Sequence, residues 1–253
     1  MTKRNQRDVV DARWEKKEST GRKVKDEEHS YRAEPVKPRN QFQVELLRAL
    51  ATKQVIVVDG SAGIGKSFVT MSVVSDMLKA GTYNKLLLSR PAVGMGHTVG
   101  LLKGDMRAKY EPYLLPLVDV LCERYGKGFY EASLGNGVIE FCPLEYVRGR
   151  NFSCVAIVDE MQNVKPSEAY TLITRVATGG KLILIGDSTQ RDIPGPTGLQ
   201  WIEWFAKRHG LEDVFTVIKT TSDDIVRGDV CKRTVKAMEK DIAEGVRFGE
   251  GLL

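Results

Sequence analysis

Residues 60–67 are the part of the sequence whose residue types and spacing point most directly to a chemical task. Gly60-Ser-Ala-Gly-Ile-Gly-Lys-Ser67 fits the pattern G-x-x-x-x-G-K-[ST] in full. Its glycines let the backbone turn its N–H groups inward around a polyphosphate, at the start of a helix. Lys66 is expected to reach the β- and γ-phosphates, and Ser67 to ligate Mg²⁺. The segment predicts a nucleotide site made of Gly60, Ser61, Ala62, Gly63, Ile64, Gly65, Lys66, Ser67 and the adjoining Phe68.

Two further polar clusters follow apolar runs. Asp159-Glu160 comes directly after residues 155–158, and Asp187 comes after residues 181–186, with Gln190 close behind. Asp159 is predicted to hold Mg²⁺, and Glu160 to polarise the water that attacks the γ-phosphate. Gln190 or Asp187 is a candidate to sense the γ-phosphate or to orient that water. The separation of the acidic pair from residues 60–67 leaves room for a strand between them, as in RecA-like ATPases that hydrolyse ATP.

Short β-branched runs alternate with helical patterns along the chain. This alternation predicts an α/β fold, a RecA-like P-loop NTPase with an open, mostly parallel sheet and helices on both faces. Strands are expected over residues 55–60, 85–89, 138–141, 154–160, 181–187 and 213–218, and helices over 40–51, 66–79, 106–125, 167–176 and 230–244. The turn formers at 135–137 predict a hairpin-like turn before the strand at 138–141. Ligands of such sheets bind where the strands end, which is where the polar clusters fall.

Composition narrows the class of protein. The 253 residues are 42% hydrophobic with a net charge of +5, which suits a globular core and permits a nucleic-acid partner. No apolar run approaches the ~20 residues of a membrane span. Four cysteines without C-x-x-C spacing and three histidines argue against structural zinc and a disulfide framework, so a cytoplasmic protein is expected.

Charge is concentrated at the N-terminus. Residues 1–38 hold 11 Lys/Arg and 8 Asp/Glu with no sustained apolar period. This composition predicts a solvated, disordered arm, or an arm that wraps a partner subunit or nucleic acid. Residues 39–253 are expected to form one ATPase domain.

From about residue 40 to 243 the chain resembles the PhoH family, whose core is akin to the first motor domain of superfamily-1 helicases. Its short, stand-alone form is similar to versions carried by bacteriophages and bacteria, which would place it in the cytoplasm of a host if it is phage-encoded. Met161 and residues 94–97 depart from the usual pattern. The matching segments are Asn40-Gln41, residues 60–67, 89–93, 101–105, 111–117, 143–150 and 159–163, Thr174-Arg175, residues 186–190, 192–194 and 224–227.

The resemblance implies ATP binding and hydrolysis, with RNA helicase or other RNA-related activity. It implies that Gln41 reads adenine. A helicase supplies arginines to the γ-phosphate from a second motor domain, which this chain lacks, so a neighbouring subunit is expected to supply them. Arg227, slightly ahead, and Arg175 are the first candidates for this catalytic role, with Arg148 and Arg150 as others. A homo-oligomeric ring, with a hexamer favoured, follows from that expectation.

Nucleic-acid contacts are expected from basic residues. Arg90, Arg148 and Arg150 are the main candidates for gripping single-stranded RNA or DNA, with Lys103, Arg107 and Lys109 beside them. Tyr110 and Tyr113 could stack on bases, although core positions suit them better. Two alternatives remain open: a nucleotide-gated ring that acts on a protein partner without nucleic acid, and a small nucleoside kinase. The presence of Glu160 next to Asp159 argues against the nucleoside kinase.

Overall fold

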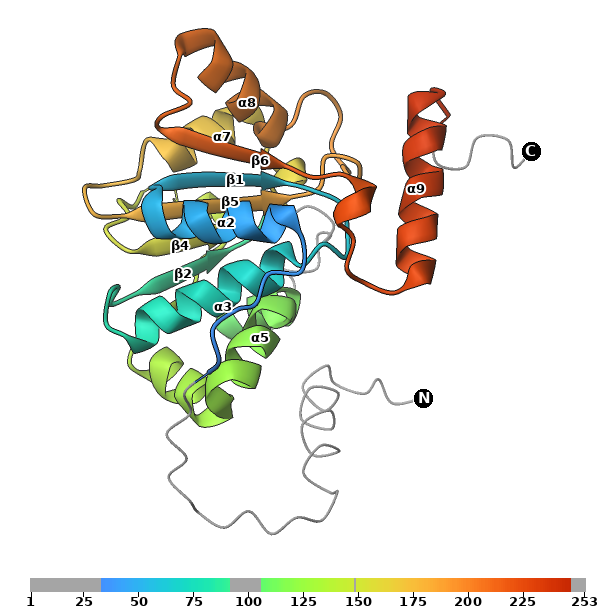
Figure 1. Cartoon of the computed structure of the whole chain (residues 1–253). Helices are drawn as coiled ribbons and strands as arrows, with labels where there is room; N and C mark the ends of the chain where they lie inside the picture. Colours follow the sequence, from blue (N-terminus) through green and yellow to red (C-terminus); the bar gives the residue numbers. More distant parts are fainter. Residues whose placement is uncertain (1–32, 92–105, 148, 247–253) are drawn as a thin grey trace, which may run out of the picture. The chain divides into compact units, whose positions relative to one another are not determined.

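The computed structural model describes residues 33–91, 106–147 and 149–246, with the backbone alone for 106–109. The N-terminal arm predicted for residues 1–38 therefore lies almost entirely outside the described residues. At the centre is a six-stranded sheet in the order β3-β2-β4-β5-β1-β6, and each neighbouring pair of strands is parallel (Figure 1). The predicted α/β fold with a parallel sheet is confirmed. The strands are β1 (Val55–Asp59), β2 (Leu86–Ser89), β3 (Ile139–Phe141), β4 (Val155–Val158), β5 (Lys181–Gly186) and β6 (Phe215–Lys219).

Helices cover both faces of this sheet (Figure 1). On one face lie α2 (Gln41–Thr52), α3 (Lys66–Lys79) and α5 (Met106–Gly135), which is broken at Gly126 by a non-helical backbone. On the other face lie α7 (Pro166–Ile173) and α8 (Gly198–His209). The remaining elements are the short helix α6 (Leu144–Val147), the 3-10 turns η1 (Met161–Asn163) and η2 (Ser222–Asp224), and α9 (Asp229–Ala243).

Burial explains why the strands are apolar without interruption. Every residue of β2, β4 and β5 is buried, since helices pack on both sides of them. Side chains alternate between the faces, so Val57, Ala156 and Leu184 join Leu172 of α7 and Ile202 of α8 in one core cluster. No helix among the described residues is long and apolar enough to cross a membrane.

The expected hairpin before β3 is wrong. Residue Gly137 has a left-handed backbone (φ 68°) and Val138 N donates to Ser133 O at 2.8 Å, so the turn ends α5. Strand β3 then pairs in parallel with β2. Glycine in the left-handed region closes helices as well as hairpins, and the sequence alone did not separate the two. Helices α6 and α8 were not predicted.

The parallel sheet brings the predicted polar residues to one edge. Hydrogen bonds continue past the last strand residues, from Gly60 N to Gly186 O at 3.0 Å and from Asp159 N to Ser89 O at 2.9 Å. The ends of β1, β2, β4 and β5 are therefore in register. The residues that follow the C-terminal ends of these four strands therefore gather at one place, where ligands of such sheets bind.

Candidate active site

The loop of residues 60–67 joins β1 to α3 and is supported from behind by the C-terminal part of the chain. Both Val226 N and Arg227 N donate to Gly63 O at 3.1 Å. Residue Gly63 has φ +86°, and a Cβ there would lie 2.9 Å from Arg227 Cβ and from Cys231 Sγ. No residue larger than glycine fits this position. The loop is thus a fixed cradle with its N–H groups at the start of α3.

The Lys66 ammonium lies across this cradle. Its Nζ donates to the carbonyls of Gly60 at 2.7 Å and Ser61 at 3.2 Å. Burial lowers the pKa of Lys66, while the negative charges of Asp187, Asp159 and Glu160, in that order, oppose the shift. The structure therefore brings the predicted lysine and the predicted acids within electrostatic range of one another.

Asp159 and Ser67 provide oxygen donors for a cation. Burial and the neighbouring Glu160 raise the pKa of Asp159 to about 6, so an ionised Asp159 is costly without a positive partner. The described residues contain no group of three or more His, Cys, Asp or Glu that could hold a metal. A hydroxyl, one carboxylate and substrate phosphates suit Mg²⁺, which usually keeps several waters. Ser67 and Asp159 thus fit the predicted magnesium ligands.

Glu160 has an unusual backbone and two side-chain contacts. It is the one non-glycine residue of the described chain with positive φ (58°). Its Oε1 lies 3.6 Å from Arg90 Nη2, and its Oε2 accepts a hydrogen bond from Gln162 Nε2. Arg90 is itself anchored, because its Nη1 donates to Tyr113 O at 3.1 Å and its backbone is bonded to the Tyr110 hydroxyl.

The segment after β5 carries the third predicted cluster. Asp187 is buried, and its two carboxylate oxygens accept from Thr189 N at 3.0 Å and from Gln190 Nε2 at 2.9 Å. The carboxylate thus holds the Gln190 amide on the nucleotide edge of the sheet. Both candidates for sensing the γ-phosphate lie together.

Gln41, which the resemblance implies reads adenine, lies on a different face of α2 from Gln43. Gln41 is exposed, and its amide donates to Glu45 at 3.3 Å. The side chain of Gln43 is buried, with Nε2 donating to Ile64 O at 2.9 Å and Oε1 accepting from Arg39 N at 2.9 Å. The signal was present in the sequence, since residue 43 shares a helix face with Leu46 and Leu50.

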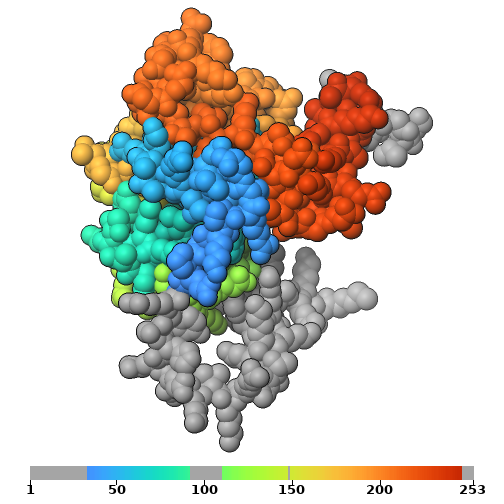
Figure 2. All heavy atoms as spheres, viewed as in Figure 1, coloured from blue at the N-terminus to red at the C-terminus, as the bar shows by residue number. Residues whose placement is uncertain are grey.

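A cavity of about 690 Å³ adjoins Gln43 and the loop of residues 60–67, the P-loop. One of its walls is formed by residues 34–37 and by Arg39, a segment that the sequence placed mostly in the arm. Figure 2 shows this N-terminal segment and the C-terminal residues meeting on one side of the molecule, where Asn40 Nδ2 donates to Asp224 O. The cavity has the size and place expected of a site for the base and sugar of a nucleotide. Its other lining residues are Gly63, Gly65, Lys66, Ser67, Phe68, Pro116, Val120, Arg124, Val226 and Arg227.

The candidate arginines are widely separated. Arg227 lies against the P-loop of its own chain. Arg175 lies near the N-terminal ends of the strands, on the opposite side of the sheet from the P-loop. Its backbone carbonyl accepts a hydrogen bond from Phe152 N, just before β4, at 2.7 Å. Arg148 lies outside the described residues.

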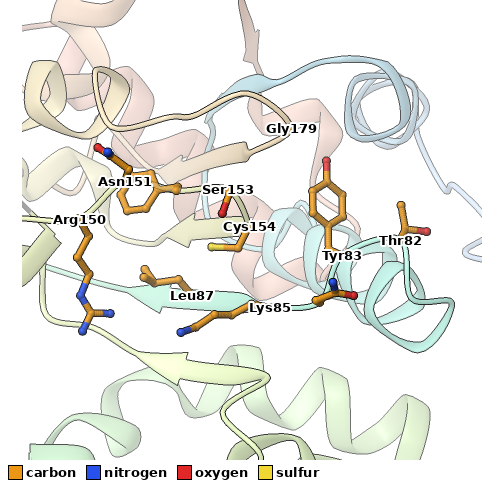
Figure 3. A pocket seen from close by; sticks show the side chains of 11 residues that line it. Thr82, Tyr83, Lys85, Leu87, Arg150, Asn151, Ser153, Cys154 and Gly179 are labelled. Atoms are coloured by element: carbon orange, nitrogen blue, oxygen red, sulfur yellow. The ribbon is translucent and has the colours of Figure 1, made fainter.

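Arg150 is not gathered with Arg90. Arg150 and Lys85 each form an ion pair with Glu140. Both basic residues line a second cavity, of about 560 Å³, at the N-terminal ends of β2 and β4 (Figure 3). Arg90 follows the other end of β2. Tyr110 is 1% exposed and occupies the core position that the sequence favoured over a stacking role. Lys103 and the side chains of Arg107 and Lys109 lie outside the described residues.

Fold and site together define a P-loop NTPase. Residues 35–239 match the family model described as PhoH-like protein, and the chain belongs to the PhoH family. It is 30% identical over 243 residues to a PhoH-like protein of Bacillus subtilis and 31% identical over 206 residues to Protein PhoH of Escherichia coli. These alignments cover 95% and 80% of this chain. The chain spans 72% of the first relative and 58% of the second.

Solved structures with a similar architecture include a phage terminase and a helicase. The large terminase of a thermophilic bacteriophage matches 80% of this chain and 49% of its own, with 16% identity and a TM-score of 0.49. The Pif1 helicase of Candida albicans matches 72% of this chain and 40% of its own, with 16% identity and a TM-score of 0.35.

Proposed function

We propose that this protein binds ATP with Mg²⁺, hydrolyses it, and couples hydrolysis to the binding or unwinding of single-stranded RNA or DNA. The hydrolytic part rests on the neighbouring parallel strands β1, β4 and β5, since the loop with Lys66, the Asp159–Glu160 pair and Asp187 follow the C-terminal ends of these strands. A polyphosphate in the loop of residues 60–67 accepts hydrogen bonds from backbone N–H groups, and Lys66 neutralises its charge. A cytoplasmic location belongs to the same proposal.

The two residues of the acidic pair have different proposed roles. Ser67 and Asp159 would hold Mg²⁺, which supplies charge neutralisation at the phosphates when bound. Glu160, held between Arg90 and Gln162, takes the proton of the attacking water. Gln190, whose amide donates to Asp187, would orient the water or sense the γ-phosphate.

Gln43 is proposed to recognise the base. Replacing it by leucine should weaken ATP binding by about tenfold, the equivalent of one lost hydrogen bond of about 1.4 kcal/mol, and reduce discrimination against GTP. Calorimetric titration of both nucleotides measures this. Gln41→Leu is the matched control, since the Gln41 side chain faces solvent. Equal effects of the two changes would contradict the assignment.

The nucleic-acid part rests on Arg90, which follows β2 on the nucleotide edge. Steady phosphate release should rise when single-stranded RNA or DNA is added at low salt. Replacing Arg90 by glutamine should reduce the slope of log affinity against log salt by roughly 0.7 for one lost phosphate contact. Arg150→Gln is the comparison, because Arg150 pairs with Glu140 at the opposite ends of the strands from Arg90. Phosphate release that ignores nucleic acid would favour the alternative, a nucleotide-gated ring acting on a protein partner.

We also propose that the protein assembles as a ring, with a hexamer favoured. Helix α9 adjoins the P-loop through Cys231, yet none of its residues is buried within the described chain, which leaves it available to a neighbour. A head-to-tail ring brings opposite sides of two subunits together. Arg175, on the opposite edge of the sheet from the P-loop, then suits a contribution to the neighbour's γ-phosphate better than Arg227 does.

Mixing variants tests the ring. An Arg175→Ala chain and a Lys66→Ala chain, each inactive alone, should recover part of the phosphate release when mixed, because each supplies what the other lacks. Light scattering gives the oligomeric state of the same samples. A monomer with full activity at high dilution would rule the ring out.

A further inference from the structure

The 3-10 turn η1 follows the acidic pair directly, and its middle residue makes two hydrogen bonds that join different strands. Gln162 is 2% exposed. Its Nε2 donates to Glu160 Oε2, and its Oε1 accepts from Asp187 N at 3.0 Å. One side-chain amide therefore connects the carboxylate after β4 to the backbone after β5.

The other contact of the Glu160 side chain is looser. The Arg90 ion pair spans 3.6 Å between partly exposed groups, a distance at which geometry is weakly fixed. The left-handed backbone of Glu160 is one that non-glycine residues rarely adopt, so its surroundings must hold it. The Gln162 amide, which belongs to a buried side chain and is itself held by Asp187 N, can do this.

The last residue of β5, Gly186, leaves space for the Gln162 amide because it has no side chain. A Cβ on Gly186 would lie 2.7 Å from Gln162 Oε1 and 3.0 Å from Gln162 N. Any larger residue at 186 would displace the glutamine. The neighbouring residue Asn163 is also tied to the segment after β5, through Asp192, but its side chain bonds to Asp192 at 2.7 and 2.9 Å and not to Glu160.

From these contacts we infer that Gln162 is a positioning residue, which aims the Glu160 carboxylate at the attacking water and ties its direction to the β5 end that carries Asp187 and Gln190. The inference rests on the proposed ATPase function. Because the amide nitrogen donates to Glu160 while the amide oxygen serves Asp187, the two roles can be separated chemically.

Gln162→Glu is the informative variant, since it keeps the acceptor for Asp187 N and removes the donor to Glu160. We expect kcat for ATP to fall about 10- to 100-fold, part of the ~10²–10⁴ that a positioned base contributes. KM and the affinity for a fluorescent ADP analogue should change less than about twofold, because the phosphate cradle is untouched. Gln162→Met, which is neutral and similar in size, guards against an effect of the added charge and should give a similar fall.

A double-mutant cycle separates positioning from general damage. If Gln162 acts through Glu160, adding Gln162→Glu to Glu160→Gln causes no further loss of single-turnover rate. Asn163→Asp makes the same amide-to-carboxylate change on the next residue, and its loss should add in full to that of Glu160→Gln. Full additivity for Gln162→Glu, or an unchanged kcat, overturns the inference. If the parent protein releases no more phosphate than Lys66→Ala, the ATPase proposal itself has failed.

Discussion

ATP binding should be lost when Lys66 is replaced by alanine. The partly buried Lys66 ammonium lies over the loop, where its Nζ donates to the carbonyls of Gly60 and Ser61, and it is the cation proposed to contact the β- and γ-phosphates. Removing one member of a buried charge pair costs about 2–5 kcal/mol, and each 1.4 kcal/mol is tenfold in affinity. Titration calorimetry with ATP and ADP measures the loss, which should be larger for ATP.

Lys79→Ala is the matched control for this change. Lys79 ends the same helix that Lys66 begins, and its Nζ lies over the Phe129 ring rather than at the loop. Its removal should leave nucleotide affinity unchanged. Parent-like ATP affinity in Lys66→Ala would show that the loop is not the phosphate site.

Turnover should stop, while binding persists, when Glu160 is replaced by glutamine. The change keeps the shape and the contact with Gln162 but removes the group that accepts the proton of water. General-base catalysis contributes roughly 10²–10⁴ in rate, so kcat should fall by that factor with little change in ATP affinity. Phosphate release and equilibrium binding, measured on the same sample, separate the two quantities.

Glu203→Gln serves as the control, because Glu203 pairs with Lys207 and Lys219 away from the site. It should hydrolyse ATP like the parent. Parent-like hydrolysis by Glu160→Gln would assign the base to another residue, with Asp187 the first to examine.

The sequence predicted the strands and the P-loop because both depend on local features. Buried parallel strands must be apolar along their whole length, and a phosphate cradle needs glycines at fixed spacing before a helix. The Asp159–Glu160 pair was found for the same reason, since it follows such a strand. The strand bounds fell within two residues of those predicted for β1, β2, β4 and β5.

Other features were missed, two of them although a local pattern was readable. Gln41 and Gln43 differ in the helix face that they occupy, and the spacing of Leu46 and Leu50 already indicates the buried face that Gln43 shares. Helix α8 went unpredicted although Thr197 and Gln200 form a capping box at its start, a pattern that was readable. The bond between Gln162 and Asp187 N joins residues 25 positions apart, and it depends on the pairing of β4 with β5, which no local pattern contains.

Phosphate release from ATP by the purified parent protein, with Mg²⁺ and after chelation by EDTA, tests the central claim most directly. The arrangement of Lys66, Asp159 and Glu160 predicts steady release with Mg²⁺, loss of that release on chelation, and none above background from Lys66→Ala purified in the same way. Absence of release from the parent protein, with or without single-stranded RNA, or equal release from parent and Lys66→Ala, would contradict the assignment of this sheet edge as an ATPase site.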